Sequence, residues 1–119
     1  MSTMGCGRIK EMKKYRLEDF KGGWFIGNFE PSLVKTEGFE VAVKHYKKGD
    51  TERKHIHKLA DEFTVIISGK CRLNGEVLIP GDIALLEKSE PMTEDFKVLE
   101  DTVTTVVKIP SVIGDKYEV

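Results

Sequence analysis

The chain has 119 residues, which is typical of one domain and long enough to bury a core without disulfides or structural metals. Its 19 lysines and arginines nearly balance 20 aspartates and glutamates, so it lacks the overall positive charge that favours nucleic acid. No apolar run approaches the roughly 18 residues that span a bilayer, and no apolar stretch of a signal peptide follows the N-terminal charges. We therefore predict a cytoplasmic protein that binds neither nucleic acid nor membranes.

The N-terminal residues differ in character from the rest of the chain. Residues 1–14 are polar and contain glycines, so we expect a disordered tail there and a single domain over 15–119. Cys6 lies in this tail and Cys71 in a predicted strand. Two cysteines so placed do not indicate a disulfide framework, and they fit a reducing compartment.

Most of the chain is predicted to form short β-strands separated by turns. After a short helical segment at 17–20, strands are predicted at 24–26, 39–46, 53–58, 62–68, 71–73, 76–79, 83–86 and 102–109. Asn74-Gly75 between two of these runs is a strong hairpin signal. Pro80-Gly81-Asp82 predicts a turn, and Pro110 ends the last strand. Many short strands with regular turns predict an all-β sandwich or barrel.

The most informative segment runs from Gly49 to Gly69. It reads G-x5-H-x-H-x4-E-x6-G, and its polar positions are His55, His57 and Glu62. Histidines two residues apart point to the same face of a β-strand, and a carboxylate on the returning strand can meet them there. Two imidazoles and one carboxylate are suitable ligands for a divalent transition metal.

This pattern resembles the first motif of the cupin superfamily, and the resemblance extends over about residues 40–110. Gly75, Pro80, Gly81 and Asp82 resemble the Pro-Gly-Asp form of the family's second motif. The resemblance implies a cupin double-stranded β-helix, a jelly-roll barrel of two antiparallel sheets with metal and ligand inside near one mouth. The implied metal is iron, manganese, nickel or zinc.

The second motif departs from the family pattern at its histidine. Familiar cupins have a Pro-His pair about ten residues after the Pro-Gly-Asp turn, whereas here Pro91 is followed by Met92. A thioether is a poor ligand for hard or borderline divalent metals. Either three protein ligands hold the metal with water at the fourth position, or Glu94 or Asp95 replaces the histidine, or the metal is lost and the polar residues are a relict patch.

Three further residues are candidates for the substrate pocket. Thr64 and Ile66 alternate with Glu62 and should share its inward face, while the residues between them face the other way as core or dimer interface. His45 shares a strand face with the apolar residues of segment 39–46. It either lines the cavity or is an ordinary half-buried histidine.

The aromatic residues near the start of the domain allow two interpretations. Trp24, Phe25 and Phe29 either stack on a flat ligand, or cover the barrel and fill a dimer interface. The second role is the commoner one beside an all-β core. Cupins commonly pair through strands and apolar faces, and the last strand, 102–109, is rich in β-branched residues. We therefore expect a homodimer.

Two functions fit these observations. The first is a metal-dependent enzyme that acts on a sugar or organic acid by isomerase, dioxygenase or lyase chemistry. Its proton-transfer residue would come from Glu94, Asp95, Tyr46 or His45. The second is a non-catalytic ligand-binding or sensor cupin without metal, although sensors are usually fused to a regulatory domain and these 119 residues contain none. In both, the partner is a small molecule.

Overall fold

The structure is a computed structural model, and it describes residues 11–119. The tail predicted at 1–14, with Cys6, therefore falls mostly outside the described residues. Residues 11–14 are exposed and have no regular secondary structure. The predicted helical segment is a single 3-10 turn, η1 (Leu17–Asp19), and a second one, η2 (Lys21–Gly23), follows it. No helix in the described part of the chain has the length and apolar character to cross a membrane.

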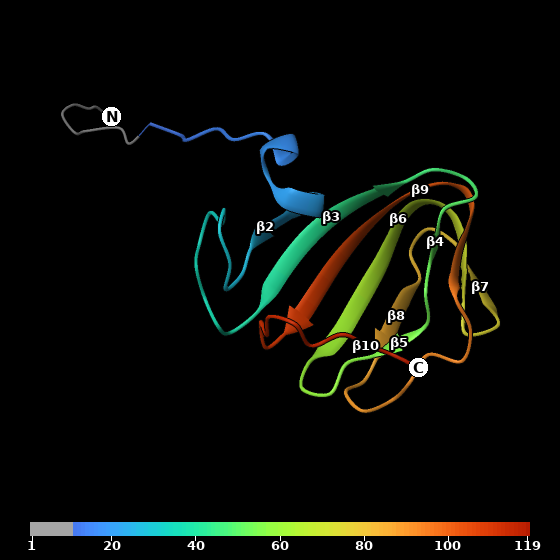
Figure 1. The fold of residues 1–119 in the computed structure, drawn as a ribbon. Helices are drawn as coiled ribbons and strands as arrows, with labels where there is room; N and C mark the ends of the chain where they lie inside the picture. The colour runs from blue at the N-terminus through green and yellow to red at the C-terminus, as the bar shows by residue number, and fades with distance from the viewer. Residues whose placement is uncertain (1–10) are drawn as a thin grey trace.

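The rest of the domain is built from antiparallel strands (Figure 1). They are β2 (Trp24–Ile26), β3 (Glu40–Tyr46), β4 (Thr51–Glu52), β5 (His55–Ile56), β6 (Asp61–Leu73), β7 (Glu76–Leu78), β8 (Ile83–Leu86), β9 (Phe96–Ile109) and β10 (Tyr117–Glu118). Within residues 11–119, seven of them form one sheet in the order β2-β3-β9-β6-β7, with β4 paired to β9 and β8 to β6. The other sheet pairs β5 with β10. The all-β prediction is confirmed.

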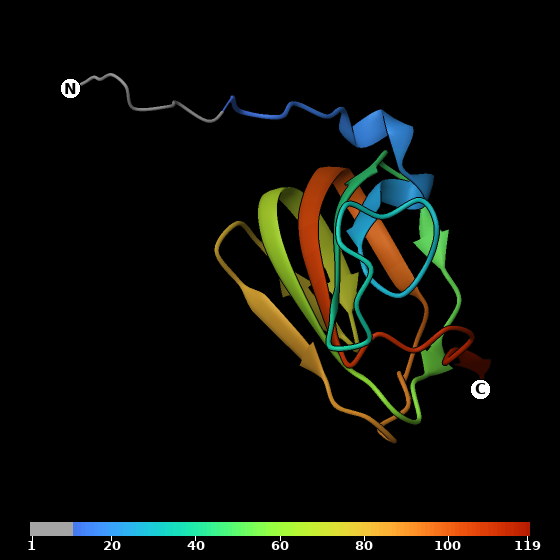
Figure 2. The same cartoon turned by 90° about the vertical axis from the view of Figure 1, so that its left-hand side faces the viewer.

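The two long strands bend the sheet into an open barrel. β6 and β9 pair along most of their lengths, but their register shifts three times between Ile66 and Cys71. Gly69 lies in this bend with a φ of +91°, and a side chain there would collide with the backbone oxygen of Asp101. β-Bulges increase the bend and twist of a strand. The long strands therefore curve strongly, and the sheet wraps around the interior (Figures 1 and 2).

Both turns predicted from local sequence are present. Asn74 and Gly75 have φ values of 49° and 81°, as a two-residue hairpin turn requires, and they join β6 to β7. Gly81 has a φ of 95°, and the carboxylate of Asp82 accepts a 2.8 Å hydrogen bond from the backbone N–H of Ile79.

The core lies at the end of the barrel where β7, β8 and the first part of β9 meet β6. Its buried residues are Ile66, Cys71, Leu73, Met92, Phe96 and Val98. Burial raises the pKa of the Cys71 thiol to about 11, so this cysteine is a structural residue rather than a nucleophile.

In strand β3 the face that carries His45 points outward, opposite to the orientation that would place this histidine in the cavity. Glu40 and Ala42 are buried and face inward, because Ala42 pairs with Val106 of β9, which itself pairs with Thr64 of β6. His45 therefore faces outward and is exposed. The alternation of apolar residues in 39–46 was misleading because the outer face of this sheet is apolar too.

The outer face is most apolar over β6 and β8. Ile83, Leu85 and Ile67 are 65%, 48% and 53% exposed. Phe63 and Val65 lie beside them, paired with Leu85 and Ile83 across the strands. Their outward orientation agrees with the prediction for the residues that alternate with Glu62 and Thr64.

Candidate metal centre

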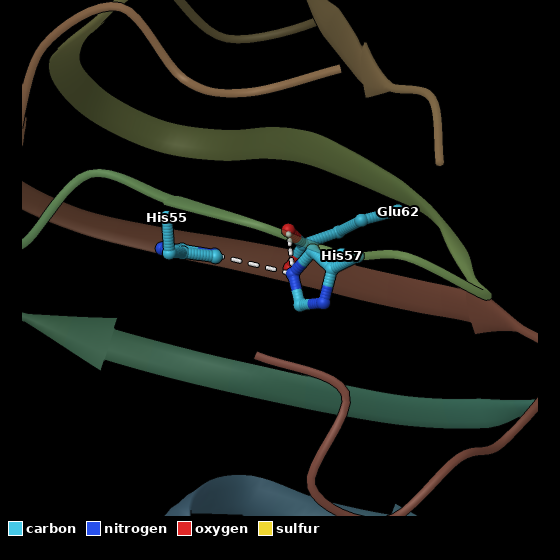
Figure 3. A group of neighbouring side chains, drawn as sticks. All are labelled: His55, His57 and Glu62. Atoms are coloured by element: carbon cyan, nitrogen blue, oxygen red, sulfur yellow. Dashed lines mark hydrogen bonds and ion pairs between the residues drawn. The ribbon is translucent and has the colours of Figure 1, made fainter. Parts of the chain in front are cut away.

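Three polar side chains converge inside the barrel (Figure 3). His55 belongs to β5, His57 is the residue directly after that strand, and Glu62 is the second residue of β6. The Nε2 atoms of the two histidines are 3.1 Å apart, and His57 Nε2 is 3.4 Å from Glu62 Oε1. Both histidines are buried, with exposures of 6% and 3%. The spacing of the motif thus brings all three groups to one point.

Backbone carbonyls orient both imidazole rings. His55 Nδ1 lies 2.9 Å from the carbonyl oxygen of Arg53, and His57 Nδ1 contacts the carbonyl oxygen of Asp115. A carbonyl accepts but cannot donate, so each Nδ1 carries a proton, and each Nε2 points into the cluster, where its lone pair can bind a metal ion. Two lone pairs and a carboxylate that face one another repel unless a cation or a proton lies among them. This donor set therefore fits a divalent metal ion.

The protonation states of His55 and Glu62 are also those of metal ligands. Burial lowers the pKa of His55 and favours its neutral form. Burial alone would raise the pKa of Glu62, but its close contact with His57 and the positive charge of Lys108 bring it below its ordinary value. Metal ligation requires neutral imidazoles and an ionised carboxylate.

Asp115 supports the centre and was not predicted from the sequence. Its carboxylate accepts hydrogen bonds from the backbone N–H groups of Lys58, Leu59 and Ala60 at 2.9, 3.0 and 2.9 Å, while its carbonyl holds His57. Burial would raise the pKa of Asp115, but these three donors outweigh it and lower the pKa. In the sequence, Gly114-Asp115 indicates only a turn, because no local feature shows that Asp115 contacts residues 55 to 58 positions earlier in the chain.

A small cavity of about 40 Å³ adjoins the cluster. Its polar lining comes from His55, Glu62, Thr64, Lys44, Tyr46 and Glu52. The Tyr46 hydroxyl donates to Glu52 at 3.1 Å, and the Lys44 ammonium lies 3.6 Å from the same carboxylate oxygen. Burial, and then the nearby charge of Glu52, raise the pKa of Tyr46, so its phenol stays protonated.

The other residues predicted for the pocket are distributed differently. Thr64 lines the cavity, whereas Ile66 faces inward but is packed in the core. His45 does not line it: this histidine belongs to an outer-face groove with Tyr15 and Arg16. The expectation that His45 is a pocket residue is therefore wrong, because its face of β3 points away from the cavity.

Neither carboxylate considered as a replacement for the missing histidine ligand belongs to the cluster. Glu94 accepts hydrogen bonds from the Arg72 side chain and the Gly75 backbone at 3.0 and 2.9 Å. Asp95 accepts one from the Lys54 backbone at 2.9 Å. The proposal of either carboxylate as fourth ligand is wrong, because the hairpin turn and the segment before β5 already hold them. Met92 is buried and closes the cavity on that side.

No protein-family model matches the sequence, and no curated protein matches it either. Solved structures do. A conserved protein from Klebsiella pneumoniae with a double-stranded β-helix domain is 18% identical, with a TM-score of 0.62 over 96% of this chain and 93% of its own. A sugar phosphate isomerase of the cupin superfamily from Silicibacter pomeroyi is 21% identical, with a TM-score of 0.58 over 66% of this chain and 54% of its own.

Oxalate decarboxylase from Bacillus subtilis, studied for its Mn(II) centres, is 19% identical, with a TM-score of 0.56 over 70% of this chain. This chain spans only 24% of the decarboxylase and about half of the isomerase. At these identities the likeness concerns the fold. The chain has the double-stranded β-helix fold of the cupin superfamily.

Proposed function

We propose that this protein is a metal-dependent cupin in which His55, His57 and Glu62 hold a divalent iron, manganese, nickel or zinc ion. The observation that carries the proposal is the convergence of two Nε2 lone pairs, 3.1 Å apart, with the Glu62 carboxylate in a buried site. Carbonyl groups hold both rings in this orientation, which would be unfavourable for a purely structural pair. The Mn(II) centres of the structurally similar oxalate decarboxylase support the proposal.

The proposed reaction is an isomerisation, a dioxygenation or a lyase reaction on a sugar or organic acid. A bound ion would act as a Lewis acid toward the substrate. Tyr46 is the one candidate proton-transfer residue of the sequence analysis that lines the cavity. Its hydroxyl proton is donated to Glu52, so toward a ligand the hydroxyl oxygen can accept a hydrogen bond, while Glu52 and Lys44 hold the residue in place.

The direct test is the metal content of protein purified without chelator. We expect close to one transition-metal ion per chain, and a rise in melting temperature when metal-free protein receives the right ion. If wild-type protein contains none and is stabilised by none of iron, manganese, nickel or zinc, the metal proposal is wrong. The protein would then be a metal-free ligand-binding cupin, an outcome that Met92 in place of the family's histidine would favour.

We also propose that the protein is a homodimer that pairs through its outer sheet face. Exposed apolar residues on neighbouring strands, among them Ile83 and Leu85, form a continuous surface with the half-buried Phe63 and Val65. Large exposed apolar patches mark interfaces, and a second copy offers a patch of identical shape and character.

Light scattering at micromolar concentration should give twice the mass of one chain. Ile83→Lys places a charge in the proposed interface and should shift the mass toward that of the monomer, while Lys88→Ala, at an exposed site beyond the patch, should not. A wild-type protein that is monomeric under these conditions contradicts the proposal.

A further inference from the structure

A larger cavity of about 350 Å³ lies beside the metal centre. Its size falls within the range of about 300–1,000 Å³ that is usual for small-molecule sites. It is open to solvent and is lined by β2 and the segment after it, by β3 and β9, and by the C-terminal segment at 112–116. The cavity of about 40 Å³ at the cluster is too small for a sugar or a substituted acid, so a larger ligand needs this second space.

Lys108 lies between the larger cavity and the metal centre. Glu40, Lys108 and Glu62 form one row across the inward face, because Lys108 of β9 pairs with Glu40 on one side and Glu62 on the other. Glu40 and Lys108 line the cavity, and Glu62 belongs to the metal centre. Asp115 also lines the cavity while its carbonyl holds His57. A ligand beside Lys108 would therefore lie one strand away from the proposed metal ligand.

One part of the lining is apolar. Its members are Trp24, Phe29, Pro31, Val112 and Ile113. Trp24 lies on the inner side of the sheet, with the Lys108 ammonium 5.0 Å from the centre of its ring. A flat or branched hydrocarbon fits such a wall better than a sugar, whose hydroxyl groups would find few polar partners.

Three ammonium groups also line the cavity, those of Lys21, Lys108 and Lys116. Among residues 11–119, neither Lys21 nor Lys116 forms an ion pair, and Lys108 has only a long contact of 3.9 Å with Glu40. Positive charge in the cavity is therefore available to an anionic ligand.

Two of the three carboxyl groups of the lining have their partners outside the cavity. Asp115 accepts three backbone N–H bonds, and Glu30 pairs with Lys35 at 3.4 Å on the surface. Glu40 accepts a 3.4 Å hydrogen bond from the Ser111 hydroxyl, and it is the one lining carboxylate that also faces a lining lysine, Lys108, at 3.9 Å. The cavity thus favours anions over cations.

We propose that this cavity binds a small carboxylic acid with an apolar body, whose carboxylate contacts Lys108 and whose body packs against Trp24 and Phe29. As the substrate class of a metal enzyme, this assignment rests on the proposed function. As a binding site it does not, since all the groups that form it belong to the metal-free chain.

The test uses metal-free protein and its own fluorescence, because Trp24 is the chain's single tryptophan. The probes are benzoate, its neutral isostere benzamide, and gluconate, an acid without an apolar body. Benzoate should change the fluorescence saturably. Benzamide and gluconate should bind at least about tenfold more weakly, as expected when one charged or one apolar contact is lost. Saturation-transfer NMR records binding independently of the fluorescence.

Lys108→Met keeps the apolar stem and removes the charge, so benzoate affinity should fall about tenfold or more. Lys70→Met is the matched control: its ammonium pairs with Glu100 outside the cavity, and affinity should not change. If circular dichroism shows that Lys108→Met is unfolded, Lys116→Met provides the test and should weaken benzoate binding severalfold.

Three results would overturn the assignment: no benzoate binding by either method, benzamide binding as tightly as benzoate, or unchanged affinity in the folded lysine variant. Each outcome is independent of the metal. Protein that binds benzoate but no metal contradicts only the proposed function, and protein that binds metal but not benzoate contradicts only the cavity assignment.

Discussion

Replacing His57 with alanine is expected to remove nearly all bound metal. The proposed centre has three protein ligands, and two cannot hold an ion as firmly. Loss of a supporting contact alone costs about 10–100-fold in metal affinity, so loss of a ligand should cost more than about 100-fold. The fold should survive, because the core around Ile66 and Phe96 does not include the histidine.

Metal content by elemental analysis and melting temperature with added metal are the measurements. Wild-type protein should gain about 2.7 kcal/mol of stability when free metal exceeds its dissociation constant 100-fold, and His57→Ala should gain almost none. His45→Ala is the matched control, since His45 is exposed on the outer face and should leave metal content unchanged. Wild-type stoichiometry in His57→Ala would rule out this centre.

Replacing Asp115 with alanine should affect both stability and metal binding. The change leaves the backbone N–H groups of residues 58–60 without their acceptor. Water can replace the lost acceptor more easily at the exposed Lys58 and Leu59 than at the buried Ala60. We therefore expect the free energy of unfolding to fall by about 2–4 kcal/mol, which is less than the full cost of three buried donors without acceptors. His57 would also lose a firmly placed carbonyl partner, and metal affinity should fall about 10–100-fold.

Denaturant unfolding and metal titration measure these two effects. Asp101→Ala is the control, because Asp101 accepts a single N–H bond, from Lys48, at an exposed site and should cost less than about 1 kcal/mol. An Asp115→Ala protein as stable as the control variant would show that the carboxylate does not hold the turn.

The contribution of Asp115 should also depend on pH. The folded state lowers its pKa, so its stabilisation is complete above the ordinary aspartate value of about 3.9 and is lost as pH falls through the lower folded value. The stability difference between wild type and Asp115→Ala should therefore narrow in acid. A difference that stays constant from neutral pH down to strong acid would contradict the hydrogen-bonded carboxylate.

Local sequence was enough to predict where most strands lie, the two turns and the three convergent side chains. It did not reveal that residues 62–68 and 71–73 belong to one strand, or that β9 begins at Phe96. Asn74-Gly75 specifies its own backbone conformation, because few other dipeptides accept positive φ at both positions. His55, His57 and Glu62 lie within eight residues on a strand end and the strand that follows, so their meeting depends on strand periodicity and one short connection. Information of this kind is contained in neighbouring residues.

Contacts between distant segments decided the remaining features. Which face of β3 points inward, and therefore where His45 lies, depends on pairing with β9 about 60 residues later. Both faces of β3 carry apolar residues, so local alternation does not show which one is buried. Glu94 and Asp95 accept hydrogen bonds from nearby backbone N–H groups and, for Glu94, from an arginine side chain. Residue spacing in the sequence does not predict these contacts. The Asp115 support and the cavity beside Lys108 likewise form only when the C-terminal segment packs against the barrel, because hydrogen bonds and burial there join residues far apart in the chain.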